Sequence, residues 1–167
     1  MNQETTETTG YVEAPKLSTG LNVLTILTFI GSAYGLYSTV SSFLSGRKAL
    51  EDFEKAQEKL SDPNVPAWAK KLAGPELHDI LVKSLDNKVP LLIIGLVGIA
   101  LCVYGAIEMR KLKKQGFTLW LIGEVLPYIG TAIFIGSAFF KSYFVYFLIF
   151  PLIFIILYFF QRKNLVN

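Results

Sequence analysis

Four long apolar runs divide this chain, and most of its charged residues lie before, between and after them. The runs cover residues 21–43, 90–109, 117–140 and 143–160. An α-helix rises about 1.5 Å per residue, so about 20 residues cross the roughly 30 Å of hydrocarbon in a bilayer. The pattern therefore predicts an all-α integral membrane protein with four transmembrane helices.

The later connections between these runs are short. A basic turn, residues 110–116, joins the second run to the third, and only Lys141 and Ser142 separate the third from the fourth. Connections of this length make neighbouring helices antiparallel. We therefore expect an up-down bundle with both chain ends on the same side of the membrane.

Lysine and arginine near the predicted helix ends indicate the orientation, because cytoplasmic loops carry an excess of them. Within about five residues of the ends, the side with the termini has seven: Lys16, Arg110, Lys111, Lys113, Lys114, Arg162 and Lys163. The other side has four: Arg47, Lys48, Lys88 and Lys141. A raw count that includes all eight basic residues of the first loop does not favour this orientation. The weighted count predicts a multi-pass protein of the cell membrane with cytoplasmic termini.

The first loop, residues 44–89, is long for a connection without structure of its own. Residues 47–60 combine good helix formers with apolar positions along one side, and two prolines interrupt residues 61–66. Residues 75–85 then show a second amphipathic pattern. We expect a small helical cap between the first two transmembrane helices, resting on the bundle or on the membrane surface.

Composition agrees with a membrane location. Hydrophobic residues make up 52% of the chain and charged residues 17%, against about 25% charged in soluble domains. The first 20 residues contain three glutamates and one lysine, which is the wrong character for a cleavable signal. We interpret residues 1–20 as a disordered, retained tail and residues 161–167 as a C-terminal tail.

The net charge of +3 comes mainly from the cluster in the basic turn. Because this cluster lies between two apolar runs, it favours contact with lipid headgroups and excludes nucleic acid as a partner. The predicted headgroup contacts are Arg110, Lys111, Lys113 and Lys114.

Small residues in the first two runs suit close helix contact better than contact with lipid tails. Gly31 and Gly35 lie in the first run, and Gly98, Cys102 and Ala106 follow one another at four-residue intervals in the second. We predict that these five positions pack against other helices.

Glu124 is the most informative side chain, because it lies about 10 Å along the third run, where an ionised carboxylate is costly. Its position indicates either a site that binds a proton, a cation or another ligand, or a neutral, hydrogen-bonded carboxyl group that holds helices together. Hairpin geometry places Glu124 at the depth of Cys102 and Tyr104, and we expect Tyr104 to be its hydrogen-bond partner. Thr28 and Ser32 lie at the same depth in the first run.

Other candidate residues carry less chemistry. Pro127 removes a backbone donor and is expected to kink the third helix. Glu108 is expected to stay solvated at the headgroup level, and His78, the single histidine, is expected at the surface.

One cysteine and one histidine make a poor metal site, and catalytic motifs such as a nucleophile elbow are absent from the sequence. We expect no metal, no cofactor and no enzymatic activity.

The hairpin GAIEMRKLKKQGFTLWLIGEVLP joins a span, a basic turn and a second span that bears Gly-Glu. It resembles small four-span inner-membrane proteins of bacteria, and the likeness extends over residues 90–160. The resemblance implies the architecture and brings no activity with it.

These observations favour a non-enzymatic bundle that acts by helix association, as a homo-oligomer or as an accessory subunit of a membrane complex. The alternative is a small transporter or channel subunit that uses Glu124 as a proton or cation site. A membrane enzyme that acts on lipid would need two or more convergent polar residues at one membrane depth.

Overall fold

The computed structural model describes residues 16–60, 64–72, 74–136, 139 and 148–166, and these residues form helices and their connections without a strand. Three helices are long and apolar enough to cross a membrane within this described part. The elements are α1 (Thr19–Leu60), α2 (Ala67–Leu72), α3 (Pro75–Asp86), α4 (Lys88–Arg110), α5 (Lys114–Phe134), α7 (Ile149–Gln161) and the 3-10 helix η2 (Arg162–Asn164).

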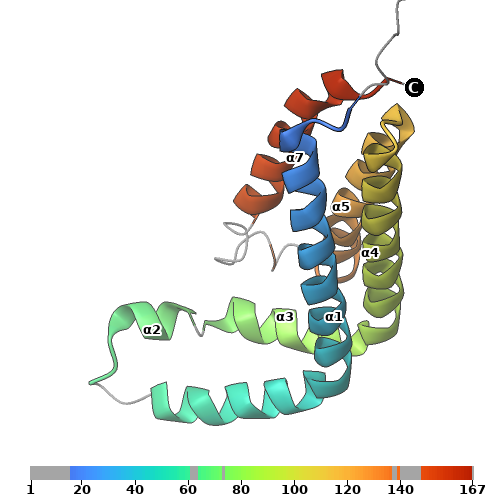
Figure 1. The fold of residues 1–167 in the computed structure, drawn as a ribbon. Coiled ribbons are helices and arrows are strands. Elements are labelled where there is room, and N and C mark those ends of the chain that lie inside the picture. The colour runs from blue at the N-terminus through green and yellow to red at the C-terminus, as the bar shows by residue number, and fades with distance from the viewer. Residues whose placement is uncertain (1–15, 61–63, 73, 137–138, 140–147, 167) are drawn as a thin grey trace, which may run out of the picture.

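Helix α4 packs against both α1 and α5, and α7 lies beside the first part of α1 (Figure 1). The start of α1, the turn between α4 and α5, and the end of α7 meet at one end of the bundle, which we call the termini end. At the opposite end, the loop end, the last part of α1 turns sharply away from the bundle and α3 runs beside it (Figure 1). Arg110 at the termini end and Lys88 at the loop end therefore mark the two ends of α4.

The first apolar run and the first loop helix form one continuous helix of 42 residues. A helix end near residue 43 was expected because charged residues begin at Arg47. Charge marks the limit of the apolar segment, however, and no proline follows until residue 63 to end the helix. The helices expected over residues 47–60 and 75–85 are both present, as the last part of α1 and as α3.

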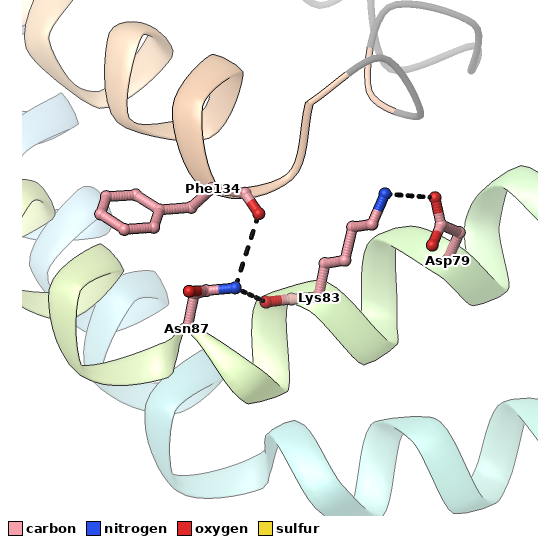
Figure 2. A network of polar contacts seen from close by, with 4 residues as sticks. All are labelled: Asp79, Lys83, Asn87 and Phe134. Carbon is pink, nitrogen blue, oxygen red and sulfur yellow. Dashed lines mark hydrogen bonds and ion pairs between the residues drawn. The ribbon is translucent and has the colours of Figure 1, made fainter.

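Helix α3 packs across the loop end of the bundle. Ile80 is buried against Ile135, which follows α5, and Leu91 and Phe139 pack around this pair. Asn87 joins the same parts, because its side-chain amide donates to the carbonyl oxygen of Lys83 at 2.9 Å and to that of Phe134 at 3.5 Å (Figure 2).

Helix α5 ends at Phe134, six residues before the expected end at residue 140. Gly136 has a φ of 74°, the left-handed conformation that glycine adopts without strain. The N–H groups of Ile135 and Gly136 both donate to the Thr131 carbonyl, at 2.9 and 3.2 Å, as in a glycine-terminated helix. The glycine stops the helix even though the sequence around it remains apolar.

The expected fourth span is seen only in its second half. Residues 140–147, which include the expected turn at Lys141 and Ser142 and the start of the run at Tyr143, lie outside the described residues. The described helix α7 has 13 residues, which corresponds to about 20 Å. Residues 1–15 of the expected N-terminal tail also lie outside the described part.

Glycines bring α4 and α5 into backbone contact. A Cβ atom at Gly105 would lie 2.5 Å from the Trp120 nitrogen and 2.6 Å from the Gly116 oxygen. A Cβ atom at Gly98 would lie 2.9 Å from the Gly123 oxygen. The predicted small-residue stripe of α4 is therefore occupied by α5 of the same chain.

A compact core at the termini end joins the first and last helices. Trp120 and Tyr158 are each 1% exposed, and their ring centroids lie 4.2 Å apart. The Tyr158 hydroxyl shares a hydrogen bond of 2.7 Å with Thr28 in α1. Leu165 is 4% exposed in the same cluster, and the Val166 N–H donates to the Leu112 oxygen at 2.8 Å. The expected C-terminal tail is thus packed onto the bundle.

We predict that Gly105→Ala destabilises the protein by about 2 kcal/mol, because overpacking a close contact costs 1–3 kcal/mol. The matched control is Gly31→Ala, since a Cβ atom there meets none of the residues that the structure describes within 4 Å. Gly31→Ala should be neutral or stabilising by up to ~1 kcal/mol, the helix preference of alanine over glycine. Thermal unfolding in detergent would measure both, and equal Tm values for the two variants would contradict the close α4–α5 contact.

Candidate functional site

A cavity of about 260 Å³ lies between α1, α4 and α5, and Phe154 of α7 also lines it. We call it the Glu124 cavity. Its polar lining consists of Thr28, Ser32, Cys102, Glu124 and Tyr128. Three of the four residues predicted for an intramembrane polar site, Glu124, Thr28 and Ser32, therefore line the same cavity.

The fourth predicted residue, Tyr104, lies elsewhere. Its side chain is 50% exposed, and it does not line the cavity. Tyr104 has the expected depth, but it is two residues from Cys102, which is about 200° around a helix. The expectation that Tyr104 is the partner of Glu124 was wrong because depth alone does not give the direction of a side chain.

Cys102 takes the position expected for Tyr104. Its Sγ atom lies 3.8 Å from Oε2 of Glu124 and 3.7 Å from the carbonyl oxygen of Trp120, both within hydrogen-bond range for sulfur. The Glu124 side chain is half-buried. No lysine, arginine or histidine forms an ion pair with it within the described part of the chain.

Sequence reasoning missed the two aromatic residues that α5 contributes to this cavity, Trp120 and Tyr128. Each lies four residues from Glu124, the spacing that places side chains on one face of a helix. The signal was therefore present in the sequence. Thr28, by contrast, is only 8% exposed and already shares its hydroxyl with Tyr158, so Ser32 is the more open hydroxyl of α1.

A second cavity, of about 280 Å³, lies toward the loop end. We call it the Lys88 cavity. Pro127 lines both cavities, so its ring lies between them on α5. The proline lies inside α5 without ending the helix, and the expected kink stays a prediction.

The basic turn makes contacts within the chain. Arg110 donates to Asn22 at 2.8 Å and to Thr25 at 3.0 Å, both in α1. Lys114 donates to the Val166 carbonyl at 3.3 Å. The turn therefore fastens the start of α1 and the C-terminal segment, which sequence reasoning did not predict.

Glu108 is the centre of the same turn. Its carboxylate pairs with Lys111 Nζ at 2.9 Å and with Lys113 Nζ at 2.6 Å, and the residue is 2% exposed. The expectation of a solvated Glu108 was wrong, because the turn, in which Leu112 adopts a φ of 61°, brings the side chains of Lys111 and Lys113 to its carboxylate. The hydrogen bond and charge of Glu108 raise the pKa of Lys111. The two lysine side chains remain 58% and 47% exposed, so their predicted contact with headgroups stays a prediction.

At the loop end, His78 is 43% exposed, as expected for a surface residue. Its Nε2 lies 3.7 Å from Glu54, and its ring lies 6.1 Å from that of Phe53. Asp79 and Lys83 form an ion pair of 2.8 Å on α3 (Figure 2). Among the described residues, no group of three or more His, Cys, Asp or Glu side chains is placed to hold a metal ion.

The chain matches no protein-family model, no curated protein and no solved structure in the three comparisons with known proteins. The resemblance to four-span inner-membrane proteins of bacteria therefore stays a prediction.

We predict that Glu108→Gln lowers the Tm in detergent, because it leaves two lysines beside each other without a counter-charge. The matched control is Glu58→Gln on the exposed last part of α1, which should leave the Tm unchanged. If both variants unfold at the same temperature, the Glu108 ion pairs do not hold the turn.

Proposed function

We propose that this protein is a four-span, non-enzymatic protein of the cell membrane, with both termini in the cytoplasm, that acts by helix association. Three helices of membrane length support the membrane location. The apolar α7 ends at the same end of the bundle as the start of α1, since Gln161 accepts a hydrogen bond of 3.0 Å from Ser18. That neighbourhood supports termini on one side.

The observation that carries this proposal is the open Glu124 cavity between α1 and α5. Hydrocarbon offers no hydrogen bonds, so polar groups that face it need a protein or water partner. The half-buried Glu124 and Ser32 lie on this cavity. A helix from another polypeptide would supply that partner.

The positions of the small residues also favour association at the α1 side of the Glu124 cavity. Gly98, Cys102 and Ala106 are already covered within the chain, since they are at most 8% exposed or in contact with α5. Within the described part of the chain, a Cβ atom at Gly35 would meet only the Ile99 side chain, at 3.7 Å, and one at Gly31 would meet nothing within 4 Å. The α1 side of the cavity is therefore where a second helix can approach closely. The second helix belongs to another copy of this chain or to a membrane complex in which the chain is an accessory subunit.

Photo-crosslinking in native membranes tests this proposal. A photoreactive residue in place of Gly31 should give one discrete crosslinked product, either a dimer of this chain or an adduct with one membrane protein. The matched control replaces Ile30, which is 63% exposed on a different face of α1, and should give no discrete product.

Equal crosslinking from the two positions, or crosslinks to lipid alone from Gly31, would contradict association through this surface. A protein that is strictly monomeric in mild detergent would contradict the proposal that it acts as a homo-oligomer.

A second function, as a transporter or channel subunit, is favoured by one further observation. Two cavities with polar linings lie on either side of Pro127, and one of them contains Glu124. An intramembrane acid beside such a cavity is suited to bind a proton or a cation. Among the described residues, one copy contributes a single carboxylate to the Glu124 cavity, so assembly would supply a second acid.

For this second function we expect proton or cation flux into liposomes that contain the purified protein, and we expect Glu124→Gln to reduce it to the level of empty liposomes. Glu58→Gln, at an exposed position on α1, should retain full flux. Flux that survives Glu124→Gln unchanged would remove Glu124 from the mechanism.

A further inference from the structure

The Lys88 cavity combines polar and apolar walls. Its hydroxyl groups come from three helices: Ser38, Thr39 and Ser42 of α1, Ser84 of α3 and Thr131 of α5. Its apolar walls are Phe43, Leu91, Leu92, Ile94, Pro127 and Ile135. Neither the association surface nor the Glu124 cavity uses these hydroxyl groups.

The charged group and two of the hydroxyl groups lie at one end of the cavity. Ser42, Ser84 and Lys88 lie at the loop end, beside the first turn of α4. Gly95 lines the cavity seven residues further along α4, or about 10 Å deeper. The cavity thus has a polar mouth at the end of the apolar helices, and its inner part, where Thr39 approaches Gly95, is lined by hydroxyl groups and apolar side chains together.

The hydroxyl groups that α1 and α3 contribute to this cavity are available to a ligand. Within the described residues, no hydrogen bond joins the side chains of Ser38, Thr39, Ser42 or Ser84 to another group of the chain, whereas Thr131 donates to the Pro127 carbonyl at 2.9 Å. Ser38 and Ser42 are exposed. Each free hydroxyl can donate one hydrogen bond to an anionic oxygen.

Lys88 supplies positive charge at the same mouth. Its Nζ atom lies 5.3 Å from the centre of the Phe43 ring, and no carboxylate of the described residues pairs with it. A lysine ammonium has three N–H donors, so contact with the ring face leaves donors for a ligand.

We propose that the Lys88 cavity binds the phosphate headgroup of an anionic phospholipid, with the ammonium and the hydroxyl groups on the phosphate and glycerol oxygens. An acyl chain leaves along the apolar wall toward Pro127. A free phosphate ion would use the polar mouth alone, whereas a phospholipid uses both parts of the lining. This inference rests on the proposed membrane location and is independent of association through α1.

The test is lipid binding to the purified full chain in mild detergent, followed by native mass spectrometry. Short-chain phosphatidylglycerol should bind saturably, phosphatidylcholine with the same chains more weakly, and inorganic phosphate not at all. Lys88→Gln should weaken phosphatidylglycerol binding about tenfold, the loss expected for one charge-assisted hydrogen bond. The double variant Ser38→Ala, Ser42→Ala should weaken it without a change of charge.

The matched control is Lys55→Gln, which removes the same charge from the exposed last part of α1 and should leave binding unchanged. Equal binding of the two lipids, or equal binding by Lys88→Gln and Lys55→Gln, would overturn the proposal. Inorganic phosphate that displaces phosphatidylglycerol at equal concentration would also overturn the proposal, because it would show an anion site without lipid specificity. Loss of lipid binding in Lys88→Gln with unchanged crosslinks from Gly31 separates this proposal from association.

Discussion

The backbone contact between α4 and α5 is the constraint on which the rest of the structure depends. Gly105 and Gly116 let the two helices approach until backbone atoms touch, and Gly98 and Gly123 continue the contact toward the loop end. This approach fixes the rotation of both helices about their axes. It turns Cys102 toward Glu124 and places Trp120 in the core at the termini end. A less closely packed pair of helices would fix the direction of neither the Cys102 nor the Trp120 side chain.

Helix α1 completes the bundle without a contact of this kind along its length. Thr39 approaches Gly95 closely, and Arg110 bonds the start of the helix, but a Cβ atom at Gly31 would meet none of the described residues within 4 Å. Small residues therefore have different effects in the closely packed pair α4–α5 and in α1. In α4 and α5 the small residues allow the two backbones to touch, whereas in α1 they line the two polar cavities on which our functional proposals rest.

The sequence predicted where three membrane-length helices lie, because runs of apolar residues have the length that a bilayer requires. It also placed Glu124, Thr28 and Ser32 on one cavity from depth alone. It did not predict the direction of Tyr104 or the burial of Glu108, since these depend on helix rotation and on the left-handed conformation at Leu112. The end of α5 depended on Gly136 in the same way, because an apolar segment gives no sign of which glycine adopts a positive φ.

The hydrogen bond between Thr28 and Tyr158 joins residues 130 positions apart in the chain. The α4–α5 pair, by contrast, needs only a three-residue turn and can form as soon as both helices have been synthesised. Contacts between distant segments form later in synthesis than local ones. The Thr28 hydroxyl of α1 therefore meets its partner only after the last helix has been synthesised, whereas the contacts that join α1 to α4 and α4 to α5 need no residue of that helix.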